Sequence, residues 1–368
     1  MKSSSISVSN SILLSLKEWI LTIALFAAIC AFIYFGWNSW ERFTPGKDHR
    51  ETCWAELQSD YWAWMRWCHY AKEHYDVLII GDSVIWGQEV RNDETISHYL
   101  NEFYGQDIFA NMGNDGLHMA GIDGIVKYYR DYLENTNVIL QFNPLWMSSE
   151  QRDLRGEKKS SYHHPRLIPQ FSSRITYYHD LNQRLGYFVE HFFRVFPFMR
   201  HIMANYFENK SISNWMMDHP YRNPFSAITF EAAPVMTEIQ GRGLDWESKK
   251  LKVENDPFID ISESIQFKCY LEALDILKKK NTRIFILLGP FNTYMFTPES
   301  QKKLIAMMDE VKKRFDTLGY PYFDSLNIGL TSETFGDTCH LLKEGHIILA
   351  DALIKDTIFQ QWLANITQ

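Results

Sequence analysis

An uncharged stretch near the N-terminus, residues 19–37, constrains this chain most, because so long an apolar run is costly to leave in water. It reads WILTIALFAAICAFIYFGW, and at ~1.5 Å of rise per residue it is long enough to cross a hydrocarbon core of ~30 Å. Indole rings favour the membrane interface, and tryptophans lie at both ends of the stretch: Trp19, Trp37 and Trp40. The pattern predicts one transmembrane helix after a short tail, residues 1–18.

A cleaved signal peptide is the alternative reading of this stretch, but its apolar region usually spans ~7–15 residues. Ala27, Ala28 and Ala31 resemble a cleavage site, yet the apolar run continues beyond them. We therefore expect an uncleaved anchor. Basic residues are divided almost evenly between the two sides of the span, so the positive-inside rule leaves its orientation open.

The composition is that of a folded protein, with 46% hydrophobic and 22% charged residues among 368. The formal net charge of −8 disfavours a nucleic-acid binder, which usually carries a basic face. The chain has five cysteines and no CxxC or His/Cys ligand spacing, so we expect neither a disulfide scaffold nor a zinc site. Cys53 and Cys68 would lie ~22 Å apart in one straight helix, and pairing them requires a break in that helix.

Short apolar runs, continuous rather than alternating, predict the strands of a buried parallel sheet. They cover residues 77–80, 108–111, 137–142, 283–288 and 320–323. Helical patterns lie between and after them, over residues 95–104, 119–133, 262–280, 298–318 and 344–363. This alternation predicts an α/β fold of three layers, αβα, with a parallel sheet of about five strands.

Residues 150–261 interrupt the alternation, because they separate two strands by far more than an ordinary crossover. Within this insertion, segment 187–207 is rich in phenylalanine with interspersed basic residues. One interpretation is a membrane-surface or partner-docking element. The other, which we favour, is an amphipathic helix packed on the core. Residues 223–257 predict long loops. We divide the rest into an aromatic-rich juxtamembrane segment, 38–75, and one domain, 76–363, that contains the insertion.

Two short segments carry residues suited to nucleophilic catalysis. The first predicted strand runs directly into Gly81-Asp82-Ser83, and open α/β sheets place their sites at the carboxyl ends of strands. Asp337-Thr-Cys-His340, before the last helix, supplies a base that can take a serine proton and a carboxylate that can orient the base. Together they predict a catalytic set of Ser83, His340 and Asp337. A structural reading of Asp82 is that it caps the following helix.

These segments resemble the SGNH/GDSL hydrolase family, over residues of about 76–145 and 262–363. Gly81-Asp82-Ser83 matches the block that holds the nucleophile, and Asp337 with His340 matches the last block. In the second block the resemblance points to the backbone N–H of Gly116 as an oxyanion donor. In the third block it points to the side chain of Asn143, although the usual Gly-x-Asn-Asp is absent and Pro144 follows.

A membrane-anchored branch of that family matches further. Asn143-Pro-Leu-Trp-Met is similar to the Ser-Pro-Gln-Trp-Phe run of the D-alanyl transfer proteins of teichoic-acid modification. Gly289-Pro-Phe-Asn292 resembles their Pro-Val-Asn turn, while their Gly-Ser-Ser is Gly-Asp-Ser here. The resemblance implies acyl or D-alanyl transfer, or ester hydrolysis, on a cell-envelope polysaccharide or teichoic-acid-like polymer. It also implies a domain outside the cytoplasm, periplasmic or extracellular, and a membrane-bound O-acyltransferase as partner.

We therefore expect a single-pass cell-membrane serine acyltransferase or esterase that needs no cofactor and no metal. The alternatives are a non-catalytic polymer-binding or scaffold partner of an O-acyltransferase, which has no need of a complete Ser/His/Asp set, and an intracellular thioesterase or lipase. Cys339 is not expected to be the nucleophile, and His118, His163 and His164 are expected to be solvated. Candidates to line the substrate site are Asp82, Trp86, Trp146 and Asn292.

Overall fold

The computed structural model of the protein describes residues 15–51, 61–156, 163–175, 180–232 and 243–366. In these residues the strands form one parallel sheet in the order β2-β1-β3-β4-β5. The sheet confirms the predicted α/β class, although β2 and β5 begin one and two residues later than expected. The strands are β1 (Val77–Ile80), β2 (Phe109–Asn111), β3 (Asn137–Phe142), β4 (Arg283–Leu288) and β5 (Tyr322–Asp324).

The continuous apolar run of β1 is explained by burial on both faces of the sheet. Successive side chains of a strand point to opposite faces. Leu78 and Ile80 accordingly join one hydrophobic cluster, and Val77 and Ile79 join another. A strand covered on both sides has no solvent-facing position, so its sequence does not alternate.

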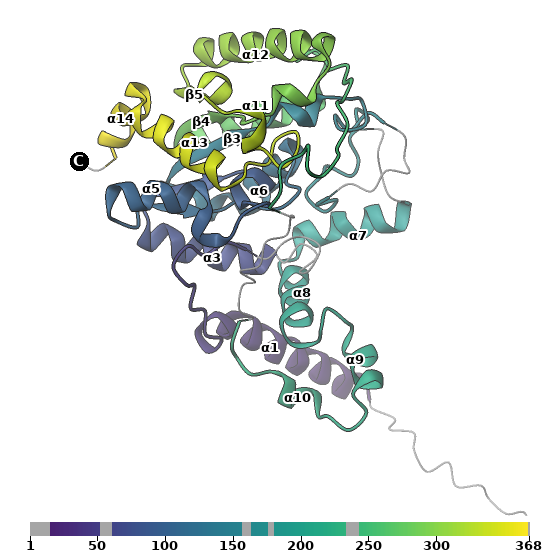
Figure 1. The fold of residues 1–368 in the computed structure, drawn as a ribbon. Helices are drawn as coiled ribbons and strands as arrows, with labels where there is room; N and C mark the ends of the chain where they lie inside the picture. The colour runs from purple at the N-terminus through teal and green to yellow at the C-terminus, as the bar shows by residue number, and fades with distance from the viewer. Residues whose placement is uncertain (1–14, 52–60, 157–162, 176–179, 233–242, 367–368) are drawn as a thin grey trace, which may run out of the picture.

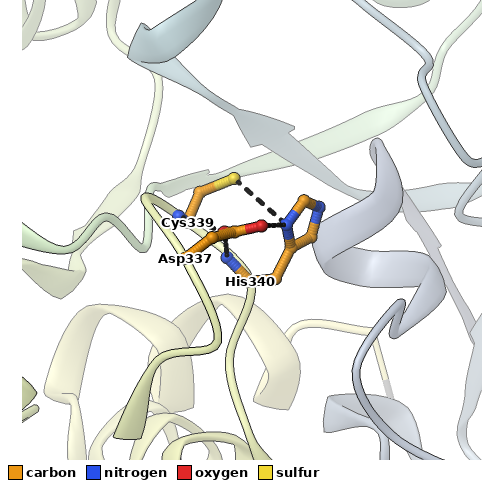
Figure 2. Close-up of side chains that lie close together, drawn as sticks. All are labelled: Asp337, Cys339 and His340. Atoms are coloured by element: carbon orange, nitrogen blue, oxygen red, sulfur yellow. Dashed lines mark hydrogen bonds and ion pairs between the residues drawn. The ribbon is translucent and has the colours of Figure 1, made fainter. Parts of the chain in front are cut away.

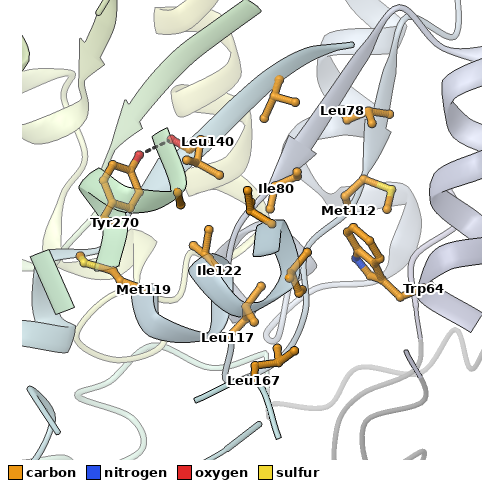
Figure 3. Packing of buried hydrophobic residues seen from close by; sticks show 14 of the residues in the cluster. Trp64, Leu78, Ile80, Met112, Leu117, Met119, Ile122, Leu140, Leu167 and Tyr270 are labelled. Atoms are coloured by element: carbon orange, nitrogen blue, oxygen red, sulfur yellow. Dashed lines mark hydrogen bonds between the residues drawn. The ribbon is translucent and has the colours of Figure 1, made fainter. Parts of the chain in front are cut away.

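Helices cover both faces of the sheet (Figure 1). The cluster that contains Leu78 also takes buried residues from α3 (Tyr61–His74), α6 (Met119–Tyr129), α11 (Ile265–Lys279) and α12 (Pro298–Leu318). The opposite cluster takes them from α5 (Ile96–Tyr104), α13 (Lys343–Lys355) and α14 (Thr357–Ala364). Figure 3 shows part of the first cluster, in which Tyr270 donates its hydroxyl to the Leu140 carbonyl at 3.1 Å.

Two of the predicted helices are interrupted. The final helix, expected as one piece over 344–363, breaks at Asp356, whose backbone is extended and whose side chain accepts the N–H of Phe359 at 2.7 Å. Aspartate favours such an N-cap position over a helix interior. The helix expected over 119–133 ends as α6 at Tyr129 and continues as a 3-10 turn, Arg130–Leu133.

The N-terminal apolar stretch forms α1 (Leu16–Trp40), which begins with a capping box between Ser15 and Glu18. Among the described residues it is the one helix long and apolar enough to cross a membrane, and its apolar window is exposed. A signal sequence near the N-terminus can have the same length and apolar composition. The aromatic segment that follows includes α3, whose Trp64 and Trp67 are buried in the core. Cys68 is a buried thiol there, and the question of its pairing with Cys53 lies outside the described residues.

The described part of the insertion begins with turns, is helical from Leu181 onward, and returns to the domain as turns and irregular chain over residues 243–261. Segment 187–207, expected as one helix, is divided between α7 (Leu181–Phe192) and α8 (Val195–Tyr206), and α9 (Ile212–Asp218) and α10 (Pro224–Ala227) follow. The returning limb, residues 243–261, is held by backbone hydrogen bonds, such as Glu254 N–H to Met295 O at 2.7 Å and Phe258 N–H to Ser148 O at 3.1 Å. These bonds lay the limb along the carboxyl edge of the sheet, where sequence alone predicted loops.

Candidate active site

Ser83, His340 and Asp337 meet at the carboxyl edge of the sheet. The Oγ of Ser83 lies 2.6 Å from Nε2 of His340, and Nδ1 of the same ring lies 2.6 Å from Oδ2 of Asp337. The second oxygen of Asp337 accepts the backbone N–H groups of Cys339 at 3.0 Å and His340 at 2.9 Å (Figure 2). The carboxylate therefore accepts the Nδ1 proton, which leaves Nε2 able to accept the proton of Ser83.

The hydrogen-bonded pair of Asp337 and His340 has shifted pKa values at both residues. Burial by itself would lower the pKa of His340, but the adjacent Cys339 and the carboxylate of Asp337 together outweigh it, and the pKa of the ring lies well above its usual range. Burial would likewise raise the pKa of Asp337, yet the imidazole and the two backbone N–H donors hold it well below its usual range. Asp337 is therefore ionised at neutral pH.

Cys339 lies beside this pair without serving as the nucleophile. Its Sγ is 3.9 Å from His340 Nδ1, the nitrogen that faces Asp337 (Figure 2). Burial raises the pKa of its thiol, so it is not a thiolate at neutral pH. Asp337, Cys339 and His340 do place three ligand atoms within 4.8 Å of one another, a spacing that suits a metal ion. A metal there would displace the proton shared by Asp337 and His340, so the two arrangements exclude each other.

Asp82 organises the neighbourhood of the nucleophile. It is the N-cap of α4 (Ser83–Trp86), where its Oδ1 accepts the N–H of Val84 at 3.0 Å. Its Oδ2 accepts from Asn143 Nδ2 at 2.7 Å and from Trp146 Nε1 at 2.9 Å. One of the two amide protons of Asn143 is thus committed to Asp82, and the other is available for an oxyanion.

Gly116 lines the same cavity as Ser83 and Asn143, in a conformation suited to glycine. Its φ is +71°, and a Cβ there would lie 2.6 Å from the ring of His163. The ring of His163 therefore packs directly on the backbone that carries the predicted oxyanion donor.

Two histidines behind Gly116 are buried, which corrects the expectation of solvated loop residues. Burial lowers the pKa of His118 to about 4 and that of His164 to about 3, so both are neutral at pH 7. Nε2 of His118 donates to the carbonyl of His163 at 3.1 Å, and Nε2 of His164 donates to that of Asp115 at 2.8 Å. They fix the backbone on either side of the Gly116–His163 contact.

The catalytic set opens into a cavity of about 720 Å³. The predicted residues that line it include Ser83, Gly116, Asn143 and Trp146. The insertion supplies a large part of the remaining wall, through Arg152, His163, Leu251, Lys252, Val253 and Glu254. The insertion thus shapes the cavity beside Ser83, which the sequence did not reveal.

Trp86 and Asn292, predicted to line the substrate site, lie behind it instead. Trp86 is buried, donates its indole N–H to Glu51 O at 2.5 Å and lies 4.2 Å from the Arg50 guanidinium. Asn292 is fully buried, accepts the N–H of Tyr294 and donates its side-chain amide to the carbonyl of Asp337 at 3.2 Å. It supports the loop that carries Asp337.

Arg50 and Lys249 are supporting residues that sequence reasoning missed. Arg50 is buried and donates to the carbonyls of Trp86, Gly87 and Val90, at the end of α4 and just beyond it. Lys249 of the returning limb donates to Glu89 at 2.6 Å and to Gly336 O at 3.0 Å, next to Asp337. No local motif marks either residue, because each acts on a segment distant in sequence.

No protein-family model matches the chain, and no curated protein matches it significantly in sequence. The likeness to SGNH hydrolases therefore remains a hypothesis carried by four short blocks.

Proposed function

We propose that the protein is a serine-dependent acyl-transfer enzyme, an esterase or O-acyltransferase, that works through an acyl-enzyme on Ser83. The observation that carries this proposal is the continuous chain of hydrogen bonds from Ser83 Oγ through the His340 ring to Asp337, with both links at 2.6 Å. The cavity of about 720 Å³ beside it has room for an ester substrate.

In the first step Ser83 Oγ bonds to the acyl carbon while its proton passes to Nε2 of His340. Asp337 stabilises the resulting imidazolium and keeps Nδ1 protonated. The tetrahedral intermediate then expels its alkoxide, which takes the proton from Nε2 and leaves as an alcohol. The acyl group remains on Ser83.

The oxyanion of that intermediate would receive backbone N–H groups from Ser83 and Gly116 and the second amide proton of Asn143. Loss of one such donor typically costs ~10²–10³ in rate. Ser83 is the first residue of α4, so its N–H has no partner within that helix and remains available.

In the second step water or a sugar hydroxyl attacks the acyl carbon, with His340 taking its proton. The bond from that carbon to Ser83 Oγ then breaks, and Oγ takes the proton back from Nε2. Water makes the protein an esterase and a hydroxyl makes it a transferase. The substrate class that we propose is an acylated cell-envelope polysaccharide or teichoic-acid-like polymer, following the resemblance to the D-alanyl transfer proteins.

We also propose that α1 anchors the protein in the cell membrane as a single span, with the domain outside the cytoplasm. The length and apolar surface of α1 support the anchor. The outward orientation and a membrane-bound O-acyltransferase as the acyl-delivering partner follow from the family resemblance.

The test is the intact mass of the full-length protein, in detergent, after exposure to a fluorophosphonate. The wild type should gain one adduct on Ser83, and Ser83→Ala should gain none. His340→Ala should react far more slowly, because the base is missing. Ser226→Ala, which removes an exposed serine of α10, serves as the matched control and should label like the wild type.

Absence of an adduct on folded wild type would contradict the acyl-enzyme and favour the scaffold reading. An adduct that persists in Ser83→Ala would place the reactive nucleophile elsewhere. Retained near-ultraviolet circular dichroism in each variant distinguishes either result from misfolding.

A further inference from the structure

The end of α1 is packed into the domain rather than joined to it by an extended linker. Trp37, in the last turn, is buried. Its ring lies 5.4 Å from that of Phe198 and 6.0 Å from that of Tyr206, both on α8, and 5.3 Å from that of Phe230 (centroid to centroid). The apolar helix is thereby attached to the insertion itself.

A buried charge cluster strengthens this attachment. Glu41, the residue after α1, has a side chain with no exposed surface. Its carboxylate forms an ion pair with Arg66 of α3. It also accepts from Tyr206 at 2.5 Å and lies 3.0 Å from Nε2 of His201, both on α8. Three helices therefore meet on one carboxylate, which restricts the direction of α1 relative to the domain.

The backbone beyond α1 adds a third connection. The N–H of Arg42 donates to the carbonyl of Phe230 at 2.8 Å, and the N–H of Ala232 donates to the carbonyl of Arg42 at 3.0 Å. Residues 207–230, which we call the lower limb, thus return to the base of α1. Figure 1 shows α8, α9 and α10 at the same end of the molecule as α1, away from the sheet.

The lower limb exposes apolar side chains that its own packing does not cover. Trp215 is buried against Phe207 and fills the interior of the limb. Met217, Tyr221 and Phe225 are 73%, 100% and 80% exposed. Ile212, Met216 and Phe230 are exposed as well.

The charges of the lower limb largely neutralise one another. Lys210 pairs with Glu208 at 2.8 Å and with Asp218 at 3.0 Å, and His219 pairs with Glu208 at 2.7 Å. Paired charges cost less to bring near a membrane than isolated ones, and they leave the apolar side chains as the dominant contact. Arg222, between Tyr221 and Asn223, adds a cation suited to anionic headgroups.

We propose that the lower limb embeds in the headgroup–acyl boundary of the bilayer that α1 crosses, as a second membrane attachment. The inference rests on the anchor role proposed for α1, since the rigid junction places the limb beside that helix. Lipid is favoured over a protein partner because the exposed side chains are continuous with the apolar helix. The limb then holds the domain in one fixed orientation relative to the membrane.

The experiment uses the full-length chain in vesicles of phosphatidylcholine and phosphatidylglycerol, with an NBD fluorophore on one exposed cysteine at a time, since Cys68, Cys269 and Cys339 are buried. Met217→Cys and Phe225→Cys report on the lower limb, in a Cys30→Ser/Cys53→Ser background. Phe103→Cys is the matched control, an exposed aromatic position (62%) on α5. Native Cys30, exposed on α1, reports on the anchor in a Cys53→Ser background.

Doxyl-labelled lipids should quench the labels at positions 217, 225 and 30 several-fold more than the label at 103, and aqueous iodide should do the reverse. If lipid quenches the label at position 30 while aqueous iodide, and not lipid, quenches the labels at positions 217 and 225, the limb proposal is overturned and the anchor remains intact. Protection of 217 and 225 from both quenchers would mean that protein covers the limb, which also overturns it. An unquenched label at 30 would remove the anchor and the limb proposal together.

Discussion

Asn143 donates its side-chain amide to the carboxylate of Asp82 over 2.7 Å. The same carboxylate caps the short helix that begins with Ser83. One buried acid therefore orients both the nucleophile and a predicted oxyanion donor. The aspartate of Gly-Asp-Ser is a positioning residue in this arrangement.

Asp82→Asn should disturb the amide of Asn143, because the new NH₂ group would face two donors, Asn143 Nδ2 and Trp146 Nε1. We expect kcat for an ester substrate to fall about 10- to 100-fold, with KM nearly unchanged, which is less than the ~10²–10³ typical of losing a donor outright. The check is a double-mutant cycle with Asn143→Ala. If Asp82→Asn slows Asn143→Ala as much as it slows the wild type, Asp82 does not act through Asn143.

The rate should rise with pH through a midpoint above the usual 6.5 of histidine. Only neutral His340 accepts the proton of Ser83, and Cys339 together with the Asp337 carboxylate holds the pKa of the ring well above its usual range. In the pH profile of kcat/KM, the midpoint of the rise on the acidic side is therefore displaced to higher pH. In Asp337→Asn the midpoint should move down, because the neighbouring negative charge is gone, while the rate itself falls. An unchanged midpoint in Asp337→Asn would contradict this assignment.

Gly116→Ala should impair catalysis beyond the ~1–2 kcal/mol of backbone strain that a positive φ imposes. The added methyl would lie 2.6 Å from the ring of His163, so one of the two must shift, and the Gly116 N–H shifts with its backbone. Gly105→Ala is the matched control, because Gly105 has φ +64° with nothing within 4 Å of the added Cβ. It should lose stability and keep its kcat. Equal activity in the two variants would argue against Gly116 as an oxyanion donor.

Glu41→Gln should loosen the attachment of α1. The substitution leaves the Arg66 guanidinium largely buried without its anionic partner, and breaking such a pair costs about 3–5 kcal/mol. We expect a clear fall in thermal midpoint in detergent, with phosphonate labelling of Ser83 retained at low temperature. Glu73→Gln, which removes an exposed partner of His69, should shift the midpoint little. Similar shifts for both variants would mean that Glu41 is not part of a buried pair.

The sequence alone determined the parallel sheet and the membrane-length helix, because both depend on local hydrophobic patterns. A strand buried on both faces is continuously apolar, and β1 and β4 show this pattern most clearly. Ser83 and the pair Asp337–His340 were also predictable, because each motif is short and lies at a strand end or before a helix. Their meeting follows from parallel topology, which brings carboxyl ends to one edge of the sheet.

Tertiary structure alone decided which neighbours of these residues face the substrate. Trp86 and Asn292 carry the same side chains whether they line a cavity or lie behind it, and their burial depends on Arg50 and on the Asp337 loop. The cavity wall from the insertion and the clamp of Lys249 on Gly336 likewise join segments far apart in the chain. Local patterns predict which face of a strand or helix is apolar, whereas long-range packing determines which polar group each buried side chain meets.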